Sequence, residues 1–423
     1  HYFCAIALIL LLSKSAFSQV SFSAATSFSS TGNSAYGVVC ADFNGDGKID
    51  YATGNVLANT LSVFVNTTTT GASTPTFAGP TNITAGNNSY RLATADFNND
   101  GKPDIAFGNN TVGVVTVVLN TTTTGSNTIT FSAGVNFTTS NSPYGITTAD
   151  INGDGKIDIV GTSYSLGKAT VLINTTTPGA ATPTFAAAVL FTTGNNPLDV
   201  CCADINLDGK PDIITGNGGA STFSVLLNTT PTGNATPTFS AKTDFAAANT
   251  STTVTFADIN LDGKPDIITG NFIAGIIAVN LNTTTVGAAT PTFSAKIEFS
   301  ASFAVYFLRI ADINGDGKPD IISGADSKIS VFLDTTSSGS ATPNLHTRID
   351  INTATQVQDL AIADFNGDGK KDLIAAGDAA TNNVAVFMNT MTLGATPFTN
   401  SSRTDFSTNA GPAGIIPIDI NSD

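Results

Sequence analysis

The chain of 423 residues has no tryptophan, only two histidines and only four cysteines. One histidine is His1, which leaves His346, and a single histidine without an evident partner is seldom catalytic. No CxxC pair signals a zinc or redox site, and the cysteine spacing does not suggest a disulfide framework. Gly-x-Ser-x-Gly, His-Glu-x-x-His and phosphate-binding glycine loops are also absent, so no standard catalytic motif identifies an enzyme.

Charged residues and amphipathic helical patterns are scarce as well. Charged residues make up 12% of the chain, and the 32 acidic against 17 basic residues give a formal charge of −15. This balance, without a basic stripe, argues against a nucleic-acid partner. No window after the N-terminal leader shows a capped helical stripe, so we expect the folded part to be all-β.

The first residues differ from the rest. Residues 5–12 are an uninterrupted apolar run, and Ala16-Phe17-Ser18 has the small-x-small form of a signal-peptidase site. The run is too short to span a bilayer, and no later segment replaces it, so we expect no transmembrane segment in the mature chain. We interpret residues 1–18 as a signal peptide clipped at its N-terminus and expect residues 19–423 to be secreted or exposed at the cell surface.

A nine-residue pattern, Asp-x-Asn-x-Asp-Gly-x-x-Asp, dominates what is present. Its leading residues are Asp42, Asp96, Asp150, Asp204, Asp258, Asp312 and Asp364, spaced 54 residues apart five times and then 52. Asp419, Asn421 and Asp423 begin an eighth copy that the end of the sequence cuts short. A fixed period of this size indicates one supersecondary unit repeated many times.

Each unit reads as four strands. In the third repeat, residues 144–149, 157–161, 169–173 and 185–191 are short runs of β-forming residues separated by Gly, Asn, Pro and Ser. Four strands per period of about 50 residues favour a β-propeller of four-stranded blades. We expect seven closed blades with spare terminal strands; eight blades are the alternative, if residues 20–28 and those past 411 share a blade.

Apolar residues recur at matching places within the units. Because neighbouring blades must offer each other the same contacts, we expect these residues to pack between blades. The first set is Phe77, Phe131, Phe185, Phe239 and Phe293, and the second, six residues later, is Ile83, Phe137, Phe191, Phe245 and Phe299.

The repeated loop has the chemistry of a calcium site. Side-chain oxygens at positions one, three, five and nine and the backbone carbonyl at position seven surround one point, and Ca²⁺ accepts six to eight oxygen ligands. A metal-free hairpin turn is the alternative, but a turn alone does not require the ninth Asp. We therefore expect about seven Ca²⁺ ions, one for each complete loop. The expected ligands are Asp42, Asn44, Asp46, Lys48 and Asp50; Asp96, Asn98, Asp100, Lys102 and Asp104; Asp150, Asn152, Asp154, Lys156 and Asp158; Asp204, Asn206, Asp208, Lys210 and Asp212; Asp258, Asn260, Asp262, Lys264 and Asp266; Asp312, Asn314, Asp316, Lys318 and Asp320; Asp364, Asn366, Asp368, Lys370 and Asp372.

The run Ala-Asp-Phe-Asn-Gly-Asp-Gly-Lys-Ile-Asp at 41–50, with relatives at 149–158 and 363–372, resembles the FG-GAP/VCBS repeat family. The resemblance implies a calcium-loaded β-propeller similar in plan to the integrin α-subunit head. Members include adhesion and ligand-binding modules, and some similar propellers are polysaccharide lyases, so the family does not select a function.

The face opposite the calcium loops is the expected binding surface, because its loops vary between repeats while the calcium loops do not. Tyr36, Tyr90, Tyr144 and Tyr306 occupy matching positions there and are candidate ligand contacts, unless each simply packs at the start of its strand. We expect a binding or adhesion module for a glycan or protein ligand. The alternatives are a polysaccharide-degrading lyase, with Arg91 or Arg309 assisting, or a purely structural surface repeat.

Overall fold

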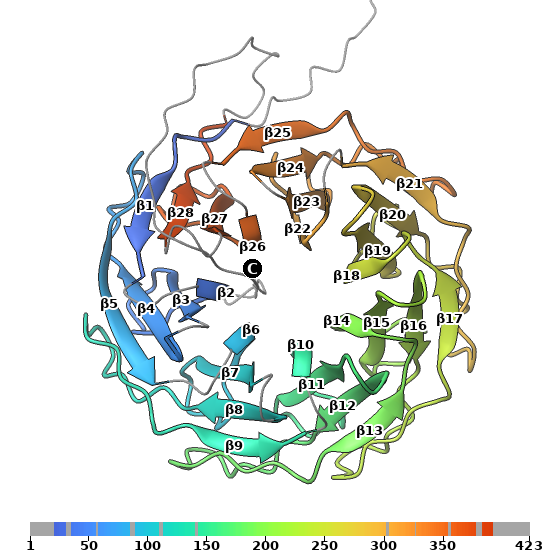
Figure 1. The fold of residues 1–423 in the computed structure, drawn as a ribbon, viewed down its shortest axis with the longest axis horizontal. Coiled ribbons are helices and arrows are strands. Elements are labelled where there is room, and N and C mark those ends of the chain that lie inside the picture. Colours follow the sequence, from blue (N-terminus) through green and yellow to red (C-terminus); the bar gives the residue numbers. More distant parts are fainter. Residues whose placement is uncertain are drawn as a thin grey trace, which may run out of the picture.

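The computed structural model describes residues 21–391 except 31–34, 56–57, 85–88, 110–112, 140–142, 302–303, 326, 354–356 and 378–382. The expected signal peptide and the eighth copy of the motif lie outside these residues. Within them the chain is all-β: seven sheets of four antiparallel strands stand in a ring, which makes a seven-bladed β-propeller (Figure 1). No helix long and apolar enough to cross a membrane occurs in the described part.

The strands fall into four concentric sets. The innermost strands are β2 (Ala35–Ala41), β6 (Ser89–Ala95), β10 (Pro143–Ala149), β14 (Pro197–Ala203), β18 (Ser251–Ala257), β22 (Phe307–Ala311) and β26 (Val357–Ala363). The second strands are β3 (Asp50–Asn55), β7 (Asp104–Asn109), β11 (Asp158–Ser163), β15 (Asp212–Asn217), β19 (Asp266–Asn271), β23 (Asp320–Ala325) and β27 (Asp372–Gly377). The third are β4 (Thr60–Asn66), β8 (Val114–Val118), β12 (Lys168–Leu172), β16 (Thr222–Leu226), β20 (Ile276–Asn280), β24 (Lys328–Phe332) and β28 (Asn383–Phe387). The outermost are β5 (Phe77–Thr84), β9 (Val135–Thr138), β13 (Val189–Thr192), β17 (Thr243–Ala246), β21 (Ile297–Ser300), β25 (Ile349–Asn352) and β1 (Thr26–Ser29).

The ring closes through the N-terminal strand. Six blades use four consecutive strands, but the seventh has the order β1-β28-β27-β26. Its outer strand β1 pairs with β28 in the register Thr26↔Val386 and Phe28↔Val384. The expectation of seven blades is confirmed, whereas the expectation that the N-terminal strand is spare was wrong: without it the last blade would expose the edge of β28.

Burial explains the pattern of apolar and polar residues along the strands. The second strand β11 is buried along its whole length because blades cover both of its faces, so its apolar residues Ile159 and Val160 are adjacent rather than alternating. The outer strand β13 alternates between half-buried and exposed residues. It begins at Val189 rather than at Phe185, which makes only an isolated bridge to Asn174, so the fourth strand of this repeat is shorter than the sequence predicts.

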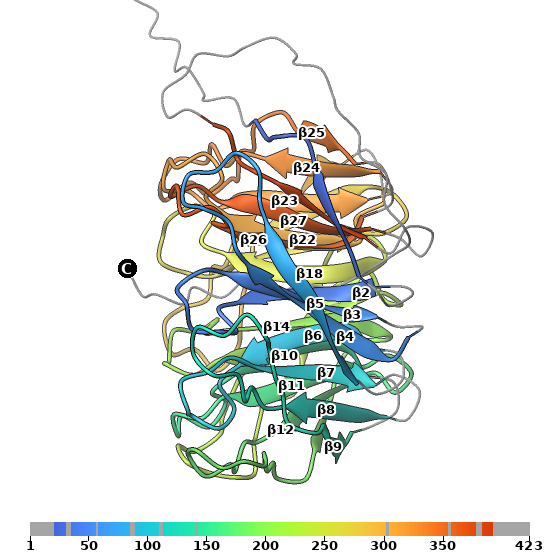
Figure 2. The same ribbon diagram turned by 90° about the vertical axis from the view of Figure 1, so that its left-hand side faces the viewer.

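The core lies between blades, as the recurring aromatic residues predict. Ring centroids of Phe137 and Phe185, from neighbouring blades, are 4.8 Å apart in an edge-to-face contact. The equivalent pairs one and two blades further on, Phe191–Phe239 and Phe245–Phe293, are 4.8 and 4.9 Å apart. These three interfaces therefore share the same edge-to-face aromatic contact. The strands run between the two faces of the disc, where the loops collect (Figure 2).

Candidate functional site

The seven candidate calcium loops join the first and second strands of each blade, so all lie on one face of the ring. Position six is a glycine in every copy, and its φ of 82–87° is left-handed, a conformation that favours glycine. This residue lets the loop turn back so that its polar side chains face its own backbone.

The Asp side chains of the first loop bind backbone N–H groups. Asp42 accepts hydrogen bonds from the N–H groups of Asp46 and Gly47, at 3.1 and 2.7 Å. Asp46 accepts one from the N–H of Lys48 at 2.9 Å. The other six loops repeat these three contacts, so every copy has the same conformation.

The ninth Asp has a structural use that the sequence does not reveal. Asp50 is fully buried, and its two oxygens accept the N–H groups of Phe43 and Asn66, at 2.9 and 2.7 Å. It thereby ties the loop to the end of β4. Burial raises the pKa of Asp50 to about 7, and the nearby charges of Asp42 and Asp46 add to this, although the two N–H donors oppose it. The equivalent pKa values, of Asp104, Asp158, Asp212, Asp266, Asp320 and Asp372, are raised to about 7 as well.

The loops offer calcium-type oxygens but no compact acid cluster. Within the described ranges, no three His, Cys, Asp or Glu side chains gather closely enough to hold a metal ion by themselves. The Asp oxygens that accept N–H groups each keep a second lone-pair direction, and calcium sites also use amide and backbone carbonyl oxygens. A metal at these loops must therefore use the Asn and backbone oxygens in addition to the carboxylates.

An unpartnered Asn oxygen in three loops fits a cation. The side-chain oxygens of Asn98, Asn206 and Asn260 are buried and have no hydrogen-bond partner. In the four loops with glycine at position four, the same oxygen accepts the N–H of position five at 3.0–3.2 Å. A buried oxygen without a donor is costly, and a cation ligated there removes that cost.

The lysine at position seven does not neutralise most of these loops. In four copies its Nζ donates to the backbone carbonyl of a threonine in the link between the third and fourth strands of the same blade, at 2.7–2.9 Å. Only Lys370 has its Nζ near a loop carboxylate, that of Asp368, at 3.3 Å. The side chain therefore braces the loop against the link rather than extending freely into solvent.

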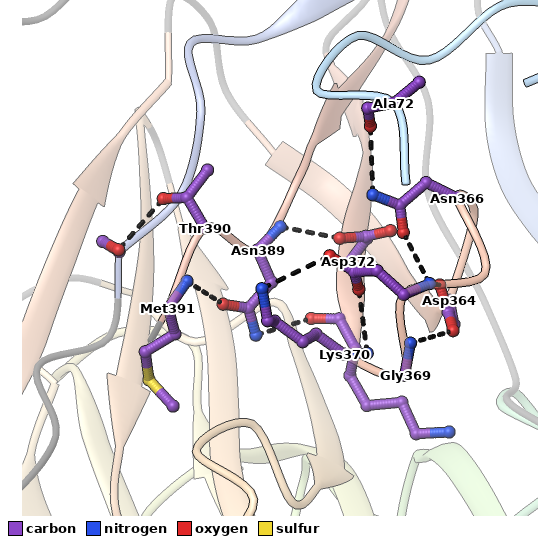
Figure 3. Close-up of polar contacts among 12 residues, drawn as sticks. Ala72, Asp364, Asn366, Gly369, Lys370, Asp372, Asn389, Thr390 and Met391 are labelled. Carbon is purple, nitrogen blue, oxygen red and sulfur yellow. Dashed lines mark hydrogen bonds and ion pairs between the residues drawn. The ribbon is translucent and has the colours of Figure 1, made fainter. Parts of the chain in front are cut away.

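The Asn at position three of the loop also forms hydrogen bonds to the neighbouring blade. The backbone carbonyl of this Asn accepts the N–H of the glycine in the next blade's Asn-Thr-Thr-Thr-x-Gly link or its variant, at 2.6–2.7 Å in six copies. In five copies its amide group also donates to a backbone carbonyl of that link, at 3.0–3.3 Å. Figure 3 shows the copy that closes the ring, where Asn366 donates to Ala72. The need for a donor explains Asn instead of Asp at this position.

The link contributes a second Asn that sequence reasoning missed. Asn66 donates from its amide to the carbonyl of Phe365, in the loop of the preceding blade, at 2.9 Å. Its backbone N–H is the donor to Asp50. The fixed recurrence of the Asn-Thr-Thr-Thr-x-Gly segment was the signal that marks this residue as structural.

On the opposite face, two of the four candidate tyrosines have described side chains. Tyr144 lies beside Tyr164 of its own blade's hairpin, with ring centroids 6.3 Å apart. Tyr306 packs edge-to-face on Phe272 of the preceding blade at 4.8 Å. Tyr36 and Tyr90 are placed only through their backbone, at the starts of β2 and β6. The described pair thus packs on neighbouring hairpins and stays half-buried.

The donors of Arg309, a candidate for lyase chemistry, are used in contacts within the protein. Its Nε and Nη1 donate to the carbonyls of Leu360 and Leu308 at 2.9 and 2.7 Å, and its Nη2 pairs with Asp359 at 2.5 Å. This guanidinium is buried and holds two neighbouring blades together.

The fold and loops define the class as a repeat-built, seven-bladed β-propeller with one Asp- and Asn-rich loop per blade. The model of the FG-GAP-like repeat matches residues 42–107, 96–161, 154–215, 312–375 and 364–423, and the chain belongs to this family. No curated protein matches it.

Solved structures share the architecture at low sequence identity. BBS1N, crystallised in complex with ARL6DN and soaked with lead, is 11% identical with a TM-score of 0.58, over 88% of this chain and 98% of that one. The mercury-soaked crystal of the same complex gives 0.57 at the same identity and coverage. Sqt1 of Saccharomyces cerevisiae is also 11% identical, with a TM-score of 0.50 over 87% of this chain and 99% of that one. At this identity the likeness shows the fold alone.

Proposed function

We propose that this propeller is a secreted or cell-surface binding module, of the adhesion type, whose rigid ring is stabilised by Ca²⁺ in the seven loops. Its ligand is a protein or a glycan, bound on the face opposite the calcium loops. The observation that carries the proposal is the contrast between two faces: loops of one repeated conformation, bonded to the next blade, on one face, and hairpins of varied sequence with exposed aromatic and aliphatic tips on the other.

Support for calcium comes from the donor set. The loops supply carboxylate, amide and carbonyl oxygens, which are the ligands of a hard cation. Three buried Asn oxygens have no donor, and seven Asp carboxylates are fully buried. In the proposed state the residues at positions one, three, five and nine hold the ion with their side chains, and position seven holds it with its backbone carbonyl.

Support for the binding face comes from its hairpin tips. Tyr164 and Leu166 are exposed between β11 and β12, and Phe272 and Ile273 are exposed between β19 and β20. Ile273 is 73% exposed, which is unusual for a large aliphatic side chain. Apolar groups clustered on variable loops of a rigid scaffold are typical of interaction sites. Aliphatic side chains beside the aromatic ones favour a protein ligand over a glycan.

The BBS1N structure is consistent with this use of the fold, because that propeller was crystallised in complex with ARL6DN. At 11% identity this neighbour supplies an example of the architecture with a partner, and it does not identify the ligand of this chain.

A matched pair of variants tests the proposal. Ile273→Asp alters the proposed face, and Val286→Asp places the same charge at a residue that is 65% exposed in a link on the calcium-loop face. On arrays of extracellular-matrix proteins and glycans in Ca²⁺, we expect Ile273→Asp to weaken binding about tenfold or more and Val286→Asp to leave it unchanged. Equal loss in both variants, or no binding to any array component, would count against this face as the binding surface.

A further inference from the structure

The central channel contains a cavity that the proposed function does not use. Its volume is about 320 Å³, and it is lined by the innermost strands β6, β10, β14, β18 and β22. These strands surround the axis of the ring in Figure 1. Known ligand pockets begin at about this volume, so the cavity suits a small molecule.

The cavity lining is part apolar and part polar. Phe256, which is 38% exposed, contributes apolar surface, whereas Ile146, Val254 and Leu308 lie behind the lining in the buried core. Thr147 and other threonines add hydroxyl groups. The lining therefore suits a small molecule that has both an apolar and a polar part.

Two acidic groups near the cavity are already bonded by the protein. Asp199 accepts the hydroxyl of Thr253 and the N–H of Val254 with one oxygen, at 2.9 and 3.2 Å, and the N–H of Val200 with the other. Asp359 is fully buried, and one of its oxygens accepts from Arg309 and from the N–H of Leu360. Asp199 therefore has little capacity to recognise a ligand, whereas Oδ2 of Asp359 is buried and has no hydrogen-bond partner.

Arg91 differs from the other charged groups of the cavity. It reaches the cavity from β6, and its side chain is 14% exposed. Its one ion pair is long, 3.8 Å from Nη1 to Oδ2 of Asp359, and its guanidinium makes no hydrogen bond to any residue in the described part of the chain. The guanidinium thus has one protein acceptor near it, Oδ2 of Asp359, which is buried and has no hydrogen-bond partner of its own, and its remaining N–H donors are available to a ligand in the cavity.

We propose that the central channel binds a small organic monocarboxylate, held by the guanidinium of Arg91. The planar fork of an arginine matches the two oxygens of a carboxylate. Asp199 and Asp359 lie close enough to Arg91 to act on it electrostatically, so a dianion such as phosphate meets more repulsion than a single negative charge does. The exposed ring of Phe256 suits a carboxylate with an aromatic body. The site depends neither on calcium nor on the proposed binding face.

Titration calorimetry of the full chain in Ca²⁺ tests this with benzoate, its neutral isostere benzamide, and inorganic phosphate. We expect benzoate to bind with an affinity at least about tenfold above that of benzamide or phosphate, because charge-assisted hydrogen bonds supply that difference. Arg91→Gln should weaken benzoate about tenfold or more. The control Arg348→Gln, at an arginine paired with Asp350 near the outer strand β25, should leave benzoate binding unchanged. Absence of benzoate binding, or equal binding to the Arg91→Gln variant, would overturn the proposal.

A second measurement covers the case in which the Arg91 variant does not fold. Crystals of the unaltered chain soaked in 4-bromobenzoate should show anomalous bromine density in the channel, with the carboxylate beside Arg91. Density only at other places, or none at a saturating concentration, would overturn the site. Ile273→Asp should leave benzoate binding unchanged, so failure of the channel site and failure of the proposed face are distinguishable.

Discussion

Replacing Asp334 with Asn should stabilise the propeller, because this position breaks a rule that the other blades obey. Six links begin with Asn, and each amide donates to a carbonyl in the preceding blade's loop at 2.8–3.1 Å. The sixth blade has Asp334 there, 1% exposed, and its Oδ2 has no hydrogen-bond partner. Its other contacts match those of Asn228: Oδ1 accepts the N–H of Thr336, and its own N–H donates to Asp320. By equivalence, the unused acceptor is the carbonyl of Ile259.

The magnitude follows from the two effects of the change. Asn supplies a hydrogen bond worth about 1 kcal/mol and removes an unpartnered buried oxygen that costs about 1–3 kcal/mol. A net gain of about 2–4 kcal/mol is therefore expected. Unfolding entropy of about 2.1 cal/mol/K per residue over 423 residues converts this gain to a rise in Tm of about 2–5 °C. Urea midpoints at fixed Ca²⁺ resolve such a difference better than Tm does.

The pH dependence separates this explanation from a general effect of removing charge. Burial raises the pKa of Asp334, although its bonds to Thr336 oppose this. A protonated Asp can donate from Oδ2 as Asn does, so the wild-type chain loses stability as pH rises and Asp334 ionises. The advantage of Asp334→Asn should therefore be largest near pH 8 and shrink toward pH 4. The reverse change, Asn228→Asp, should destabilise most at pH 8. A variant no more stable than wild type at pH 8, or an advantage that does not depend on pH, would refute the reasoning.

The remaining predictions concern the calcium loops. Burial raises the pKa of the seven Asp side chains at position nine to about 7. Between about pH 4 and 7 these groups therefore bind more protons in the folded than in the unfolded chain. In EDTA, the Tm should accordingly fall as pH rises through that range. Millimolar Ca²⁺ should raise the Tm most at pH 7–8, where the ligands are ionised; a melting curve that Ca²⁺ leaves unchanged at pH 8 contradicts the calcium assignment. Leu207 and Leu261 have φ of 54° and 51°, where four other loops have glycine. Leu207→Gly and Leu261→Gly should therefore each raise the free energy of unfolding, measured from the urea midpoint, by about 0.5–1 kcal/mol. An unchanged or lower midpoint in both would show that the left-handed leucines are not strained.

The sequence predicts the repeat architecture because its signals are local and repeated. The nine-residue loops, the β-forming runs between them and the recurring Phe positions each lie within one period, and the structure has four strands per blade at these places. The fourth strand was predicted too long because Phe185 packs as an interface residue before the ladder begins at Val189.

The features that the sequence does not predict depend on contacts between distant parts of the ring. The pairing of β1 with β28 joins segments about 360 residues apart, and no local pattern specifies it. The meeting of Arg91, Arg309 and Asp359 has the same origin, because the three residues come from different blades. The asymmetric residues of a repeat protein are visible in the sequence, but only closure of the ring brings them together.

The contacts of the Asn at position three would give calcium, if it binds as proposed, a role beyond each hairpin. The side-chain oxygen of Asn98 is buried without a partner, while its backbone carbonyl and amide group bond the link of the next blade through Gly179 and Ala180. A cation that fixes this Asn therefore fixes an interface between blades as well as a turn. Asn366 makes the same contacts to Gly71 and Ala72 across the closure, and among the described residues six of the seven loops bond the next blade through this carbonyl. Calcium bound at these loops should then stabilise the ring as one cooperative unit, with a single unfolding transition that shifts as a whole when the metal is removed.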